Sequence, residues 1–225
     1  MAGGNMAKKE GIVSLPSANE IVKMFLKFSS IGYASGAEPL LATEQNLLGI
    51  VPNNTRVFTF NQGKWTYYDV YFVGVGGRSG GSTLLTFAGN PVFSMSYNGR
   101  VITETCQKLG IDPHEVTQFL RLALQYQYQG WEEHGALAFV GGRGPRIFPY
   151  LESQGITTGN LQYYNEVSSN DLRDFHGCEW IIVLAKTHKP EDFDRCILSD
   201  DVSQSDGAER IFYHRYQGGL LVPAE

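Results

Sequence analysis

Cysteine is scarce in this chain, with three residues in 225, at Cys106, Cys178 and Cys196. Their number is odd, and no two of them form a CxxC pair. Zinc sites and disulfide frameworks need closely spaced or evenly paired cysteines. We therefore expect neither, and we expect no metal or other cofactor. Unpaired, reduced thiols are typical of the cytoplasm, which predicts a cytoplasmic location.

The chain also has few basic residues and no long apolar segment. The chain has 18 Lys and Arg against 23 Asp and Glu, a net charge of −5, and its longest basic cluster is the pair Lys8 and Lys9. A nucleic-acid-binding protein usually carries a clustered basic face, so we expect no direct binding of nucleic acid. No apolar run reaches the ~18 residues of a membrane span, and residues 1–17 lack the apolar core of a secretion signal. We therefore expect no contact with a membrane.

Aromatic residues and glycine are abundant instead, with 12 Tyr, 13 Phe and 26 Gly. Flat rings pack well on a pleated surface, so this composition favours a β-sheet. The segments that read as strands are 56–60, 64–74, 82–89, 91–102, 161–167, 178–186 and 210–222. Their short spacing predicts antiparallel meanders.

Two segments carry the signature of a capped helix. Ser17 is followed three residues later by Glu20, and Asp112 is followed in the same way by Glu115. This is the spacing of a capping box, in which each side chain bonds a free backbone N–H of the first turn. Pro113 follows Asp112 at the first helical position, where a backbone N–H would have no partner within the helix and its absence in proline costs nothing. Apolar residues then recur at helical spacing in both segments.

The order of these elements suggests an internal duplication. Residues 91–102 resemble residues 210–222, and each half of the chain has a capped helix followed by strands. Residues 99–110 read as a linking helix that stops at a glycine. We therefore predict an α+β fold with an antiparallel β-sheet built from two pseudo-repeats, each a capped helix followed by a β-meander. The halves, 17–110 and 111–225, would form one compact domain behind an N-terminal extension, 1–16.

Six segments together resemble a known family: FLKFSSIGYASG, WTYYDVYFVG, GNPVFSMSYNGRV, GGRGPRIF, FHGCEWI and YHRYQGGLL. In this order they resemble an uncharacterised bacterial domain-of-unknown-function family, often found behind helix-turn-helix segments in putative transcriptional regulators. The resemblance spans roughly residues 20–222, and it implies a fold but no activity. The chain departs from it at residues 81–83, Gly-Ser-Thr, where members carry an acidic pair. The stretch before residue 17 is also too short for a helix-turn-helix.

The glycine-rich stretch GVGGRSGGST, residues 74–83, raises the question of a phosphate-binding loop. Such a loop needs a lysine directly before its Ser or Thr, but here Ser82 follows Gly81. A dinucleotide-binding loop must lead from a strand into a helix, whereas strand-like sequence follows here. We therefore predict a flexible connection between two strands.

Asp69 is the most suggestive polar residue. Strand alternation places it on one face with Trp65, Tyr67 and Tyr71. A carboxylate framed by tyrosines could bind a polar ligand or act as a base with a raised pKa. It could equally accept hydrogen bonds from tyrosine hydroxyls in a purely structural role. Both interpretations stay open at this point.

Other charged and nucleophilic residues permit further interpretations. Arg143 and Arg146 lie in a glycine- and proline-rich segment, where they could bind an anion or anchor the loop to the rest of the domain. Arg78 and Arg100 also stand beside glycines, and convergence of two arginines on the face of Asp69 would favour an anionic or zwitterionic ligand. The remaining candidates are His176 and Cys178, two apart on a strand like a base and its nucleophile, and His214, which suits a core or a pocket.

Taken together, these residues predict a non-catalytic binding module. It would accept a small polar or anionic ligand, or a protein partner, on an aromatic-rich sheet, and an oligomer is left open. The alternatives are a structural or assembly subunit and, with less support, an enzyme that uses Asp69 or the pair His176 and Cys178. The residues predicted to bind the ligand are Tyr67, Asp69, Tyr71, Tyr97, Arg143 and Arg146.

Overall fold

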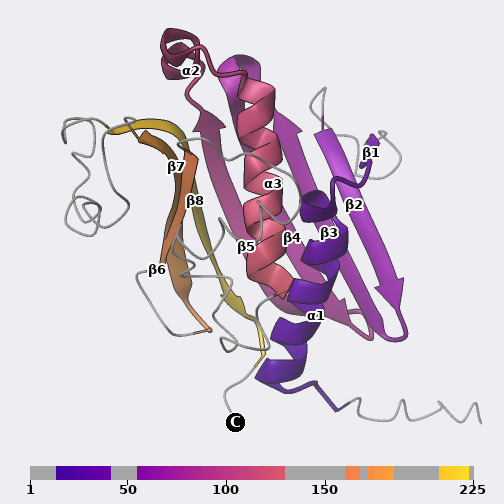
Figure 1. Cartoon of the computed structure of the whole chain (residues 1–225). Helices are drawn as coiled ribbons and strands as arrows, with labels where there is room; N and C mark the ends of the chain where they lie inside the picture. Colours follow the sequence, from indigo (N-terminus) through magenta and orange to yellow (C-terminus); the bar gives the residue numbers. More distant parts are fainter. Residues whose placement is uncertain (1–13, 42–54, 130–160, 168–171, 185–207, 223–225) are drawn as a thin grey trace, which may run out of the picture.

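A computed structural model describes residues 14–41, 55–129, 161–167, 172–184 and 208–222. These residues form one antiparallel sheet of eight strands, with two long helices lying across one of its faces (Figure 1). The predicted α+β class and the predicted antiparallel sheet are therefore confirmed.

Seven of the eight strands lie close to the expected segments, and the short strand β1 was not predicted. They are β1 Leu40–Leu41, β2 Thr55–Gln62, β3 Trp65–Val73, β4 Arg78–Phe87, β5 Asn90–Val101, β6 Leu161–Val167, β7 Phe175–Leu184 and β8 Ala208–Leu220. Their order across the sheet is β1-β2-β3-β4-β5-β8-β7-β6. Strands β2 to β5 form one meander and β6 to β8 another. The last strands of the two meanders, β5 and β8, pair side by side.

The helices all come from the expected segments. They are α1 Ala18–Ile31, α2 Thr103–Leu109 and α3 Pro113–Gln129. Helices α1 and α3 contact each other and cover the same face of the sheet, and α2 lies beyond the end of β5 (Figure 1). Two short 3₁₀ turns, η1 Tyr33–Ser35 and η3 Val75–Gly77, follow α1 and β3. None of the described helices combines the length and the apolarity that a membrane crossing requires.

The predicted capping box forms at α1, and at α3 the Asp112 side chain caps the helix. At α1 the Glu20 N–H donates to Ser17 Oγ at 3.4 Å, and the Ser17 N–H donates to Glu20 Oε2 at 2.8 Å, which completes a capping box. At α3 the Asp112 carboxylate accepts from the backbone N–H of His114 at 2.8 Å. Helix α2 ends at Gly110, whose φ of 68° favours glycine. The local sequence thus marks the starts of α1 and α3 and the end of α2.

The capping box predicts a measurable loss on mutation. Ser17→Ala removes the acceptor of the Glu20 N–H, and we expect it to lower the free energy of unfolding by about 1 kcal/mol. Ser14, which is exposed and precedes the helix, is the matched control, and Ser14→Ala should change stability much less. Urea denaturation of the two variants measures the difference. Equal stability of both variants would contradict the prediction.

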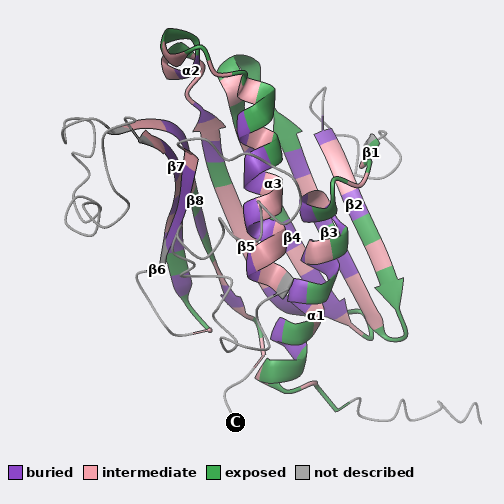
Figure 2. Ribbon diagram, viewed as in Figure 1, coloured by how far each residue is buried: buried purple, intermediate pink, exposed green. Residues whose placement is uncertain are grey.

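The core lies between the helices and the sheet. Figure 2 shows buried residues on the sides of α1 and α3 that face the strands. One cluster gathers under α1, where the rings of Phe25 and Phe93 lie 4.5 Å apart. A second cluster gathers under α3 and contains Cys106, Phe119 and Ile211. The two helices therefore bury separate parts of the same sheet face.

The glycine-rich stretch 74–83 is partly a turn and partly a strand. Residues 74–77 connect β3 to β4, closed by a hydrogen bond from the Gly74 N–H to the Arg78 carbonyl at 2.7 Å. The predicted connection between two strands is thus confirmed for these residues. Gly80 and Gly81, however, belong to strand β4, so the flexible connection is shorter than predicted. Because β4 rather than a helix follows, the stretch lacks the geometry of a dinucleotide-binding loop.

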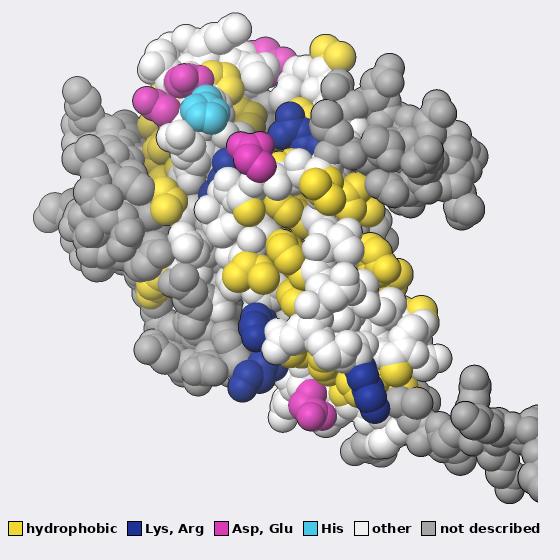
Figure 3. Space-filling view, turned by 90° about the vertical axis from the view of Figure 1, so that its right-hand side faces the viewer, with side chains coloured by type: hydrophobic (Ala, Val, Ile, Leu, Met, Phe, Trp, Pro, Cys, Tyr) yellow, Lys and Arg dark blue, Asp and Glu magenta, His cyan; other side chains and the backbone are white. Residues whose placement is uncertain are grey.

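The outer surface carries mixed side chains. Figure 3 shows hydrophobic side chains gathered across the middle of the face that lies on the right in Figure 1. Lys and Arg side chains stand on this face in several separate places rather than in one continuous patch among the described residues.

Candidate ligand-binding cavity

A cavity of about 380 Å³ lies between the two long helices and the sheet. Small-molecule sites commonly enclose about 300–1,000 Å³, so the cavity is large enough for a compact organic molecule. Its lining comes from α1, α3 and strands β3, β4, β5, β7 and β8. The exposed lining residues Val73 and His114 lie near the start of α3. The cavity therefore reaches the surface at that end.

Four of the residues predicted to bind a ligand line this cavity. They are Tyr67, Asp69 and Tyr71 from β3, and Tyr97 from β5. The predicted alternation in β3 is confirmed, because these three residues of the strand are buried while Tyr68 between them is exposed. Tyr97 joins them because β4 and β5 pair in a register that carries its ring over Gly81.

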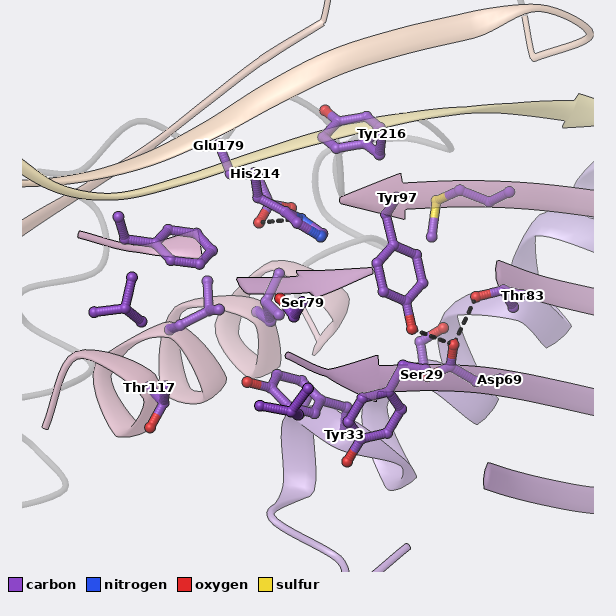
Figure 4. Close-up of a pocket in the computed structure, with 18 of the residues that line it drawn as sticks. Ser29, Tyr33, Asp69, Ser79, Thr83, Tyr97, Thr117, Glu179, His214 and Tyr216 are labelled. Carbon is purple, nitrogen blue, oxygen red and sulfur yellow. Dashed lines mark hydrogen bonds and ion pairs between the residues drawn. The ribbon is translucent and has the colours of Figure 1, made fainter. Parts of the chain in front are cut away.

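Asp69 is almost fully buried, with 6% of its surface exposed. Its Oδ1 accepts hydrogen bonds from the Tyr97 hydroxyl at 2.6 Å and from Thr83 Oγ1 at 3.2 Å (Figure 4). Burial disfavours the charged form and raises the pKa of Asp69 to about 6, although these two hydrogen bonds and nearby His214 oppose the shift. Asp69 is therefore mostly ionised at neutral pH despite its burial.

A second carboxylate lines the cavity on the other side of Tyr97. Glu179 on β7 lies directly opposite His214 on β8, and its Oε2 is 3.4 Å from His214 Nδ1. The two atoms are in ion-pair range but lack hydrogen-bond geometry, and both are buried without another hydrogen-bond partner. The ring of His214 is 5.2 Å from the ring of Tyr97. Tyr97 thus stands between Asp69 and the His214–Glu179 pair (Figure 4).

The tyrosine hydroxyls in the cavity are held in their neutral form. Burial raises the pKa of Tyr97 and Tyr67 well above the ordinary value, and the charge of Asp69 adds to the effect. Burial likewise raises the pKa of Tyr128 and Tyr216, and the charge of Glu179 contributes to both shifts. These hydroxyls therefore remain hydrogen-bond donors across the physiological pH range.

Glycines in the strands make room for the side chains of the site. A Cβ on Gly81 would lie 2.7 Å from Cζ and from Oη of Tyr97 and 2.5 Å from the Val70 carbonyl oxygen. Gly99 lies directly opposite His214 in the register, and a Cβ there would meet the backbone and ring of His214. Glycine within a strand often marks such a close approach.

The arginines of the sequence hypothesis do not converge on Asp69 in the described residues. Arg78 and Arg100 are paired across β4 and β5. They alternate with the cavity-lining Ser79 and Val101 and so face the opposite side of the sheet. Arg143 and Arg146 lie outside the described residues.

The histidine and thiol candidates lie elsewhere. His176 and Cys178 share one strand face, as predicted, but Glu179, the residue after Cys178, faces the cavity. The pair therefore lies on the far face of the sheet, next to Arg215 and Gln217. Among the described residues, no group of three or more His, Cys, Asp or Glu side chains could hold a metal ion.

Several lining residues were missed from the sequence, and Glu179 is the most important. It lies in the strand FHGCEWIIVL, on the same face as the buried residues Phe175 and Ile181. An acidic residue on an apolar strand face is itself a signal of a special site, because an unpaired buried charge is costly. The other lining residues left unassigned include Tyr33, Tyr128 and Tyr216.

Comparison with known proteins adds no name to this site. The chain has no significant match among protein-family models, curated proteins or solved structures. The resemblance to an uncharacterised bacterial family therefore stays a prediction, and the function rests on the geometry of the cavity.

Proposed function

We propose that the protein is a non-catalytic binding module that holds a small molecule in the cavity between the helices and the sheet. The observation that carries the proposal is a pair of buried carboxylates in a cavity that opens at the start of α3. Glu179 Oε2 has no hydrogen-bond partner there. Burying a polar atom without a partner costs free energy, and a bound molecule would supply the missing interaction.

A binding role is favoured over catalysis by the contacts of the polar groups. Nucleophilic catalysis needs a hydroxyl, thiol or amine in hydrogen-bond contact with a base that a third group orients. In the described cavity, Asp69 accepts from the hydroxyls of Thr83 and Tyr97, and its side-chain hydrogen bonds include no third group that would orient it as a base. The polar groups are thus arranged around Asp69 as donors to a fixed carboxylate.

The proposal includes three expectations from the sequence. We infer that the two helix-plus-meander halves arose by duplication, and the side-by-side pairing of β5 and β8, the last strands of the two meanders, supports this. The halves each contribute one carboxylate, Asp69 and Glu179, to the same cavity. The cytoplasmic location and the relationship to a bacterial family remain part of the proposal.

A blocked cavity tests the binding function. Thr117 on α3 lines the cavity, while its neighbour Gln118 is exposed and does not. We expect Thr117→Trp to fill the cavity and weaken binding of a neutral probe, tryptophol, by about tenfold or more, because the indole ring would occupy the same space. Gln118→Trp is the matched control and should leave binding unchanged.

Isothermal titration calorimetry measures the binding of both variants, and thermal unfolding shows that both remain folded. Binding that is equally strong in the two variants would place the site elsewhere and contradict the proposal. If tryptophol, its ammonium analogue tryptamine and its carboxylate analogue indole-3-acetate all fail to bind the unmutated protein, the structural or assembly role becomes the better interpretation.

A further inference from the structure

The described lining of the cavity is acidic. It contains two carboxylates, Asp69 and Glu179, together with His114 and His214, and it contains no Lys or Arg among the described residues. His214 pairs with Glu179, so no side chain of the described lining forms an ion pair with Asp69. A buried carboxylate without a cation is unfavourable unless something else compensates it.

Both carboxylates keep unused hydrogen-bonding capacity. The two hydrogen bonds that Asp69 accepts from side chains both end on Oδ1, which leaves Oδ2 without a side-chain donor in the described structure. Only 6% of the surface of Glu179 is exposed, and its Oε2 has no hydrogen-bond partner. A ligand that donates hydrogen bonds and carries positive charge would satisfy both atoms.

The two carboxylates act on the tyrosines that surround them. Beyond the effect of burial, Asp69 raises the pKa of Tyr67 and Tyr97, and Glu179 raises that of Tyr216. Two arginines lie close by, Arg121 over the ring of Tyr33 at 5.0 Å and Arg56 in a hydrogen bond to Tyr71. Neither forms an ion pair with Asp69 or Glu179 in the described part of the chain.

The remaining wall suits the apolar part of such a ligand. Aromatic rings line much of the cavity, contributed by Tyr33, Tyr71, Tyr97, Tyr128, Phe212 and Tyr216. The face of an aromatic ring attracts a cation, and the attraction grows when water is excluded. The same rings bury an apolar body, because apolar area removed from water stabilises a complex.

We infer that the ligand is an organic ammonium ion with an aromatic or apolar body, and that Asp69 is the counter-ion of its ammonium group. The inference rests on the proposed function and specifies its ligand class. It replaces the anionic ligand considered from the sequence, because two carboxylates and no described arginine or lysine line the cavity.

Three indole compounds of similar shape test the charge preference. Tryptamine carries an ammonium group, tryptophol a hydroxyl and indole-3-acetate a carboxylate. By isothermal titration calorimetry at pH 7.5 we expect tryptamine to bind tighter than tryptophol by about tenfold or more, and indole-3-acetate to bind most weakly. Asp69→Asn should bring tryptamine to the level of tryptophol and leave tryptophol itself nearly unchanged.

The control is Asp174→Asn, because Asp174 is exposed and does not line the cavity; this variant should keep the full preference for tryptamine. Equal binding of the three compounds, or tightest binding of indole-3-acetate, would overturn the inference. The binding function itself would survive that result if Thr117→Trp still blocked all three compounds. Failure of every compound to bind would overturn both.

Discussion

Replacing Asp69 by Asn is expected to raise the free energy of unfolding at pH 7 by about 3 kcal/mol, because each tenfold change in proton affinity is worth about 1.4 kcal/mol. Burial raises the pKa of Asp69 from 3.8 to about 6. The folded protein therefore holds an ionised carboxylate at neutral pH that water would solvate better. Asparagine carries no charge, and its carbonyl oxygen can still accept from Tyr97 and Thr83.

The pH dependence follows from the same shift. Below the unfolded pKa, Asp69 is protonated in both states and its ionisation costs the folded protein nothing. As the pH rises toward and through about 6, the unfolded chain ionises first, and the fold loses stability. The advantage of Asp69→Asn should therefore be full above pH 6 and vanish below about pH 4. The other titratable groups that face Asp69 are Tyr67, Tyr71, Tyr97, Tyr128 and His214.

Urea denaturation between pH 4 and pH 8 measures this difference, and the exposed residue Asp174 again supplies the control through Asp174→Asn. A variant Asp69→Asn that is less stable than the unmutated protein at pH 7 would mean that the charge itself holds the fold together. A gain in stability combined with a loss of tryptamine binding would mean that the protein keeps a destabilising charge for its function, a trade-off common at binding sites.

Local sequence signals predicted the elements of this fold because each acts over a few residues. Ser17 and Asp112 mark the starts of the long helices, and their side chains bond backbone N–H groups of the first turn. The alternation around Asp69 predicted which residues of β3 share a face, since successive side chains of a strand point to opposite faces. Such signals need no knowledge of the rest of the chain.

The cavity could not be predicted in the same way, because it depends on contacts between distant segments. Glu179 and Asp69 line one cavity only because β5 pairs with β8, and β8 in turn with β7. A shift of that register by one residue would turn His214 to the opposite face. The sequence shows which residues are unusual, whereas strand pairing decides which of them meet.

The glycines of residues 74–83 illustrate the same limit. From sequence, glycine predicts a turn, because it tolerates conformations that other residues avoid. Gly76 and Gly77 fit that expectation, with φ values of 68° and 71°. Gly81 does not fit that expectation, because it lies in strand β4 and leaves the space that Tyr97 fills. That requirement depends on a neighbouring strand.

Gly81→Ala is accordingly expected to destabilise the protein by about 3 kcal/mol. The new methyl group would lie 2.5 Å from the Val70 carbonyl oxygen and 2.7 Å from the hydroxyl of Tyr97. The first contact is with backbone and cannot relax cheaply, and the second pushes Tyr97 away from Asp69. We therefore expect a loss of stability together with weaker tryptamine binding, measured by thermal unfolding and by calorimetry.

The loss of stability in Gly81→Ala should come from steric crowding at residue 81 and not from replacing glycine by alanine as such. Gly74 is the matched control, because its φ of −94° suits alanine and a Cβ there would meet its nearest neighbour at 3.7 Å; Gly74→Ala should cost far less. If the ring of Tyr97 is part of the clash, Tyr97→Ala will cost less in the Gly81→Ala protein than in the unmutated one. Strictly additive effects of the two substitutions would mean that the Val70 carbonyl alone excludes the methyl group and that Tyr97 keeps its place over the cavity.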